Sequence, residues 1–68
     1  MKYYYVYILQ SKNYSNKYYT GFTDDLKKRL DKHNEGGVPY TSKYKPWIIK
    51  NFFAFRSKEK ASNFEKSP

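Results

Sequence analysis

The stretch that decides the fold is residues 3–22, YYYVYILQSKNYSNKYYTGF. Its first seven residues are all aromatic or β-branched except Leu9, a composition typical of a β-strand. Residues 13–16 are Asn, Tyr, Ser and Asn, which favour a turn. Residues 17–22 return to strand-forming side chains. The stretch therefore predicts a β-hairpin whose loop is longer than two residues.

A helix is expected directly after this hairpin. Thr23 or Asp24 can cap its N-terminus, because both offer a side-chain oxygen to the free backbone N–H groups there. Acidic side chains at this end also suit the positive pole of the helix dipole. The pair Gly36-Gly37 ends the helix, which places it at residues 24–35.

One face of this helix carries the side chains of interest. At 100° per residue, Leu26, Leu30 and His33 point in nearly the same direction. Arg29 lies at the edge of that face and is four residues before His33, so their side chains can converge. We expect Leu26 and Leu30 to pack inward, and His33 to be either a core histidine or part of a site.

The second half of the chain predicts a loop, a strand and a helix. Residues 38–46 predict a basic, aromatic loop. Residues 47–55 predict a third strand, apolar on both sides and therefore covered on both. Ser57 caps a last helix that starts at the next residue and turns Ala61 and Phe64 inward. The order strand–strand–helix–strand–helix predicts an α+β fold, a three-stranded antiparallel sheet flanked by helices.

Composition excludes several classes of protein. The 68 residues predict one domain, 1–68. No cysteine and a single histidine leave no thiolate or histidine zinc site, so any metal must be a hard cation held by carboxylates. The longest uncharged run, residues 3–11, is far shorter than the roughly 20 residues of a membrane helix. Without a signal-peptide pattern, we expect no membrane partner and a cytoplasmic location.

Charge and aromatic content point to nucleic acid. Fourteen Lys and Arg against six Asp and Glu give a net charge of +8. Fifteen residues are aromatic and only eight are Leu, Ile or Val, so the core must be largely aromatic. Basic side chains meet phosphates and rings stack on bases. The alternative is a lysine-rich protein whose charges only keep it in solution.

Common catalytic motifs are absent from the chain. It contains no P-loop, no dinucleotide-binding glycine motif and no nucleophile elbow. Two tyrosine triplets remain, Tyr5-Val6-Tyr7 in the first strand and Tyr19-Thr20-Gly21 in the second. Gly21 leaves room for a backbone or a phosphate to approach beside Tyr19. Arg29 and His33 on the first helix and Glu65 on the last complete the candidates.

This ordered set resembles the GIY-YIG nuclease family. Tyr5-Val6-Tyr7 is similar to the first motif of the family, and Tyr19-Thr20-Gly21 is similar to the second. The helix carrying Arg29 and His33 resembles the family's helix, and Pro46-Trp47 resembles the start of the next strand in its small bacterial members. The resemblance runs from about residue 3 to residue 65 and implies a three-stranded antiparallel sheet with flanking helices.

Position by position, the resemblance implies a metal-dependent endonuclease that hydrolyses phosphodiester bonds. Tyr7 and Tyr19 would face the scissile phosphate, and Arg29 would stabilise the charge that develops on it. His33 would assist proton transfer or orient the nucleophile, and Glu65 would hold one Mg²⁺ or Mn²⁺ ion. A phenol of pKa near 10 is a poor base at neutral pH, whereas an imidazole is a better one, so the identity of the general base stays open. We expect the five groups to line one concave site.

The implied substrate is DNA, with RNA not excluded, and includes the branched or damaged strands of DNA repair. Lys27, Lys43 and Lys45 are the candidate nucleic-acid contacts outside the catalytic set. Three departures from the family pattern stand out. Tyr5 replaces the first glycine, and Phe22 stands where some relatives carry a lysine. The chain ends soon after Glu65, so we expect a truncated or divergent form with a shortened last helix.

Two other functions fit the same sequence. A basic nucleic-acid-binding module without catalysis would bind with a steep salt dependence and cleave nothing. A protein-interaction domain would meet an acidic partner through its basic surface and would bind no nucleic acid.

Overall fold

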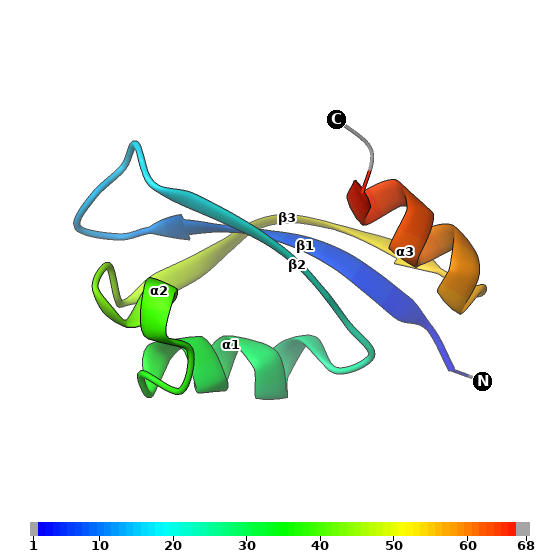
Figure 1. The fold of residues 1–68 in the computed structure, drawn as a ribbon, viewed down its shortest axis with the longest axis horizontal. Helices are drawn as coiled ribbons and strands as arrows, with labels where there is room; N and C mark the ends of the chain where they lie inside the picture. Colours follow the sequence, from blue (N-terminus) through cyan, green and yellow to red (C-terminus); the bar gives the residue numbers. More distant parts are fainter. Residues whose placement is uncertain (1, 67–68) are drawn as a thin grey trace.

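The computed structural model describes residues 2–66 and shows a twisted sheet with α1 on one face and α3 on the other (Figure 1). The elements, in chain order, are β1 (Tyr4–Ser11), β2 (Tyr18–Thr23), α1 (Leu26–Asn34), α2 (Pro39–Ser42), β3 (Trp47–Phe55) and α3 (Lys58–Lys66). The strands are antiparallel in the order β2-β1-β3. The predicted α+β class and three-stranded antiparallel sheet are confirmed. No helix of residues 2–66 is long and apolar enough to cross a membrane.

Strand β1 lies at the centre of the sheet and sets the directions of the key side chains. Tyr7 pairs with Gly21 of β2 and with Phe52 of β3. Alternate residues of a strand point to opposite faces, so Tyr7 and Leu9 share the face covered by α1. There they form the buried core cluster with Trp47, and the predicted inward face of α1 packs against it. Tyr7 therefore lies in the middle of the sheet, beneath α1.

Gly21 is required by Tyr7 and not by Tyr19. A Cβ atom at Gly21 would overlap the hydroxyl of Tyr7 and the ring carbon that carries it. The room that the sequence predicted for a backbone or a phosphate is therefore filled by the phenol of the opposite strand. This contact ties the two triplet motifs together across the hairpin.

The start of α1 differs from the prediction by one or two residues. Asp25 is the N-cap, because its Oδ1 accepts the backbone N–H of Lys28 at 3.1 Å. Thr23 instead accepts the N–H of Asp25 through its hydroxyl oxygen at 3.0 Å and stabilises the turn before the helix. The expectation that Thr23 or Asp24 caps the helix was wrong. Gly36, with a φ of 85°, follows the helix where its end was predicted.

The expected loop at residues 38–46 contains a short helix. α2 begins with Pro39, whose fixed φ suits the first position of a helix and whose missing N–H costs nothing there. Thr41, in this helix, is fully buried. The prediction of a continuous loop was therefore wrong over four residues.

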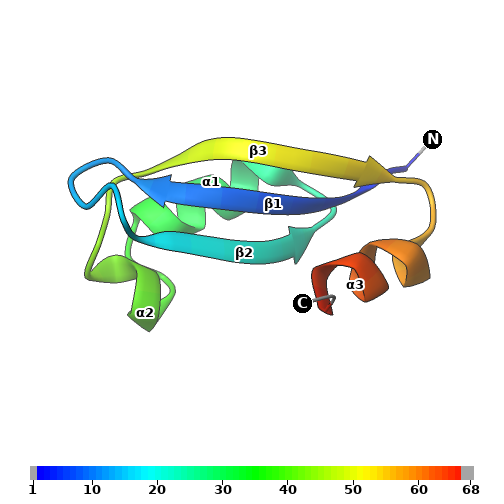
Figure 2. The same ribbon diagram turned by 90° about the horizontal axis from the view of Figure 1, so that it is seen from above.

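The apolar composition of β3 suggested that both of its sides are covered, and this expectation was wrong. Strand β3 is an edge strand with a single neighbour, and α3 lies toward the β2 side of the sheet (Figure 2). Ile48 and Phe52 are each 48% exposed and Phe53 is 38% exposed. A run of apolar residues cannot distinguish a central strand from an edge strand, because both present the same side chains.

The last helix begins as predicted. The Ser57 hydroxyl accepts the backbone N–H of Lys60 at 3.3 Å, and Ala61 is fully buried. Phe64 packs its ring on Phe53 and Phe55, with centroids 4.9 and 5.3 Å apart, but stays 43% exposed. The inward direction of Ala61 is confirmed, whereas Phe64 covers an open edge of the sheet.

Candidate active site

Three aromatic side chains from distant parts of the chain meet between the sheet and α1. The ring centroids of Tyr19 and His33 lie 4.9 Å apart, and Tyr7 lies 6.5 Å from Tyr19 and 6.0 Å from His33. Each comes from a different element, β1, β2 or α1. The antiparallel hairpin brings the two tyrosines to one face, and the helical period turns the imidazole toward them.

A chain of hydrogen bonds runs through His33 and determines its tautomer. The Thr41 hydroxyl donates its one proton to the Val38 carbonyl oxygen at 3.2 Å. Its oxygen therefore accepts from His33 Nδ1, 2.8 Å away, which places the imidazole proton on Nδ1. His33 Nε2 then carries a lone pair and accepts a hydrogen bond from the Tyr7 hydroxyl, 3.1 Å away. Thr41 thus orients the imidazole so that its basic nitrogen faces the phenol.

Burial acts on the pKa values of both partners. It lowers the pKa of His33 from its usual 6.5, and the charges of Arg29 and Lys32 lower it further. His33 is therefore neutral at pH 7, as the hydrogen-bond chain requires. Burial raises the pKa of Tyr7 to about 12, against the opposing effect of Arg29. Tyr7 is accordingly a protonated phenol at neutral pH and acts as a donor to His33.

Arg29 is the cation nearest to this pair and is open to solvent. It is half-buried and lines a pocket of about 250 Å³ together with Lys2, Lys58 and Asp24. Its charge affects the pKa of both Tyr7 and His33, so it lies close to both. The pocket holds three cations and one carboxylate, a composition that suits a phosphate group.

Glu65 approaches the site from the other face of the sheet. It lies on α3, is half-buried, and its charge makes a small contribution to the raised pKa of Tyr7. Within residues 2–66, no three His, Cys, Asp or Glu side chains lie together as a ready-made cage for a metal ion. A single carboxylate fits Mg²⁺ or Mn²⁺, which takes its other ligands from phosphate and water, and does not fit zinc.

Burial divides the candidate residues into two groups. Tyr7 and His33 are each 1% exposed, whereas Tyr19, Arg29 and Glu65 are half-buried. The expected single concave site lined by all five groups is therefore not what the structure shows. Tyr19 and Arg29 are therefore the more accessible of these groups, whereas Tyr7 and His33 are shielded from solvent.

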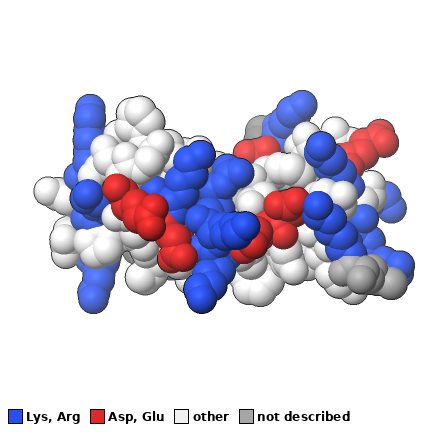
Figure 3. Space-filling view, turned by 90° about the horizontal axis from the view of Figure 1, so that it is seen from below, with Lys and Arg blue, Asp and Glu red and all other residues white. Residues whose placement is uncertain are grey.

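The candidate lysines all lie on the surface but in different places. Lys43 and Lys45 are exposed in the segment after α2. Lys27 is exposed on α1, where 100° per residue puts it on the opposite flank from Arg29. Figure 3 shows the α1 face, where Lys and Arg side chains gather over the middle with acidic side chains directly beside them. Charge alone therefore does not single out this face.

Thr41 is a site residue that sequence reasoning missed. It follows His33 by eight residues and lies in a segment predicted to be a loop. The aromatic and basic composition of this segment predicts an exposed surface, and it does not predict that the Thr41 hydroxyl is buried.

A small α+β domain that presents the tyrosines of a β-hairpin to an arginine and a histidine on the next helix has the architecture of a nuclease domain. The family model described as the GIY-YIG catalytic domain matches residues 3–67. The chain therefore belongs to the GIY-YIG family, as its motifs predicted. This is a nuclease superfamily whose members act on nucleic acid and generally use a divalent metal.

The curated relatives reported next are named as UPF0213 proteins. The chain is 44% identical over 62 residues to the UPF0213 protein BH0048 of Halalkalibacterium halodurans, covering 90% of this chain and 64% of that protein. It is 42% identical over 62 residues to the UPF0213 protein SpyM50708 of Streptococcus pyogenes serotype M5, covering 90% and 65%. A solution NMR structure of BH0048, there assigned to Bacillus halodurans, matches with a TM-score of 0.53 and 41% identity over 93% of this chain and 66% of the other. The chain thus spans just under two thirds of these relatives.

Proposed function

We propose that this protein is a metal-dependent endonuclease that hydrolyses phosphodiester bonds in DNA. The observation that carries the proposal is the hydrogen-bonded chain Thr41–His33–Tyr7 beside Arg29. A neutral imidazole whose basic nitrogen is aimed at a phenol is a proton acceptor held ready in a cationic site. Membership of a nuclease superfamily supports the same conclusion.

The accessible residues bind the phosphate in this proposal. The guanidinium of Arg29 offers a fixed fork of N–H donors that matches two phosphate oxygens. Its positive charge stabilises the negative charge that builds up as water attacks phosphorus. The hydroxyl of Tyr19, half-buried over the His33 ring, orients the same phosphate or the attacking water.

The buried pair moves the proton in a single concerted step. Burial disfavours both the Tyr7 phenolate and the His33 imidazolium, so transfer of a proton from Tyr7 to His33 alone is unfavourable. A free Tyr7 phenolate is therefore not a resting intermediate. Tyr7 instead passes its proton to His33 Nε2 as it takes one from the nucleophile, so the imidazole is the final acceptor. In this proposal Tyr7 relays the proton and His33 is the general base.

Glu65 is the residue that would hold the divalent cation. When bound, this cation would supply positive charge to stabilise the negative charge that builds up during hydrolysis. The carboxylate itself contributes a negative charge near Tyr7. Burial is the main cause of the raised pKa of Tyr7, and the charge of Glu65 adds only a small part.

Plasmid cleavage with Mg²⁺ or Mn²⁺ tests the proposal, with omission of the metal as control. Arg29→Ala should reduce the cleavage rate by about 10²–10³-fold, the usual cost of removing one donor that stabilises the transition state. Arg56→Ala is the matched control, since it removes the same charge from an exposed position after β3. Equal activity of both variants with the wild type would reject the assigned site.

A binding module without catalysis is the second candidate. It is favoured by the burial of Tyr7 and His33, each only 1% exposed. In that case binding to duplex DNA would weaken with salt, with a log–log slope of about −0.9 per phosphate contacted. No divalent ion would then produce cleavage, and Tyr7→Phe would leave binding unchanged.

A further inference from the structure

A row of four tyrosine rings leads away from the candidate active site. Tyr19 lies 6.3 Å from Tyr40, Tyr40 lies 5.8 Å from Tyr44, and Tyr44 lies 5.4 Å from Tyr14, measured between ring centroids. The rings come from β2, from α2, from the segment after α2 and from the β1–β2 loop. We call these four side chains the tyrosine row.

The tyrosine row is an open surface and not a part of the core. Tyr40 is 51% exposed and Tyr14 is 50% exposed, while Tyr19 and Tyr44 are half-buried. Neighbouring rings are tilted by 34° to 81° and do not stack face to face on one another. The exposed ring surface is therefore free to take another planar group.

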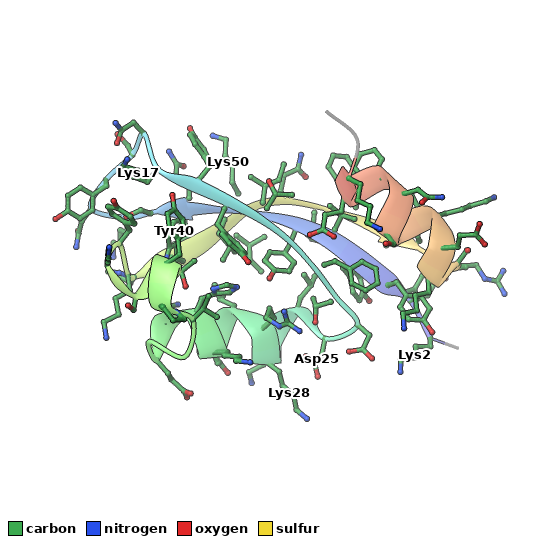
Figure 4. All side chains as sticks on the ribbon, in the orientation of Figure 1. Lys2, Lys17, Asp25, Lys28, Tyr40 and Lys50 are labelled. Atoms are coloured by element: carbon green, nitrogen blue, oxygen red, sulfur yellow. The ribbon has the colours of Figure 1, made fainter. Side chains whose placement is uncertain are left out.

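Lysine side chains accompany the row. Lys17 places its Nζ 5.2 Å from the centre of the Tyr44 ring, and Lys43 and Lys45 flank Tyr44 in the chain. Figure 4 shows Tyr40 above α2 and Lys17 at the same end of the sheet. All six carboxylates of the chain lie outside residues 1–23 and 36–58, the two segments that supply the row. The α1 face, by contrast, mixes both signs of charge (Figure 3).

Hydrogen bonds hold the backbone of Tyr14 and Tyr44, two members of the row, in place. The buried hydroxyl of Ser11 donates to the Tyr44 carbonyl oxygen at 2.6 Å and accepts the N–H of Tyr14 at 3.1 Å. The N–H of Tyr44 also donates to the carbonyl oxygen of Thr41 at 3.1 Å. A platform that is already ordered loses little conformational entropy on binding.

We propose that the tyrosine row binds an unpaired nucleic-acid strand, so that the substrate carries a single-stranded segment next to the bond that is cut. The aromatic rings can stack on the free bases of such a strand, and the neighbouring lysines can bind its phosphates. A duplex already stacks its bases on each other and would meet these rings only with its backbone. The inference deepens the proposed nuclease function and rests on it for the cleavage step, but the binding surface stands by itself.

Binding measured without divalent cations tests the tyrosine row separately from the nuclease activity. Fluorescence anisotropy compares a short labelled oligothymidine with a blunt duplex that has the same number of phosphates, at one salt concentration. We expect the wild type to bind the single strand more tightly. Tyr40→Ala and Tyr14→Ala should each weaken this binding by about 5- to 150-fold and leave duplex binding unchanged.

Tyr18→Ala is the matched control, because Tyr18 is 46% exposed on β2 and no ring contact connects it to the row. It should change neither affinity. Tyr40→Trp should retain or strengthen single-strand binding, since a larger ring stacks at least as well; thermal melts confirm that each variant folds.

Equal binding of single strand and duplex would overturn the proposal. So would an unchanged affinity in Tyr40→Ala, an equal loss in Tyr18→Ala, or no binding to either DNA. Single-strand binding through Tyr40 without any cleavage would instead refute the nuclease function and leave the tyrosine row intact. Cleavage of a blunt duplex as fast as of a substrate with a single-stranded segment would support the nuclease function and refute the single-stranded requirement.

Discussion

Replacing Thr41 by valine tests the hydrogen-bonded chain at the point where it is anchored. Valine has nearly the same shape as threonine and exchanges the buried hydroxyl for a methyl group. His33 Nδ1–H loses its acceptor at 2.8 Å, and the Val38 carbonyl oxygen loses one of its two donors but keeps the N–H of Ser42 at 3.0 Å. Thr41 is 0% exposed, so water does not replace either partner at the surface.

The magnitude follows from the burial of these groups. A buried donor left without a partner costs about 1–3 kcal/mol of unfolding free energy. In a domain of this size each kcal/mol lowers Tm by roughly 4–8 °C. The imidazole can lessen the cost by moving its proton to Nε2, which then donates to the Tyr7 oxygen and forces the phenol proton to turn away. Thr41→Val is therefore expected to lose stability and to reverse the hydrogen bond between His33 and Tyr7.

Nitrogen-15 NMR of the imidazole ring measures the tautomer directly. His33 is the one histidine of the chain, so the two ring-nitrogen signals need no assignment against others. At pH 7 the wild type should show its proton on Nδ1. Thr41→Ser, which keeps the hydroxyl and loses one methyl group, should show the same tautomer, whereas Thr41→Val should place the proton on Nε2. A wild-type protein with its proton on Nε2, or a valine variant with wild-type stability and tautomer, would show that Thr41 does not determine the tautomer of His33.

Three further predictions concern the same site. Gly21→Ala should destabilise the fold by about 1–3 kcal/mol in urea denaturation, because its new Cβ overlaps the Tyr7 phenol; wild-type stability would contradict the packing described. The pKa of His33 is lower in the folded than in the unfolded state, so the unfolded chain takes up the extra proton below pH 6.5. As the pH is lowered below 6.5, the unfolding free energy should then decrease by at most about 1.4 kcal/mol per pH unit, a contribution that His33→Gln should remove. Glu65→Gln should abolish metal-dependent cleavage whereas Glu59→Gln, on the same helix, should not; equal activities would exclude Glu65 as the metal ligand.

Local chemistry made much of the fold predictable. Strand-forming residues on both sides of a turn indicated the hairpin, and Ser57 and Gly36 marked a helix start and a helix end. The helical period predicted that Leu30 and His33 face the sheet together. These features depend on residues a few positions apart, whose relative directions are set by the backbone geometry of a helix or a strand.

The tertiary structure decided what depends on contacts between distant residues. Tyr7 and His33 are 26 positions apart, and only packing shows that their side chains meet, that they are buried, and that Thr41 orients the imidazole. The edge position of β3 was equally hidden, because strand order is a property of the sheet and not of any one strand. Sequence alone determined which chemical groups are available and which way each one points along its own element. Packing determined which of them touch, which are shielded from water, and hence which donate, accept or bind.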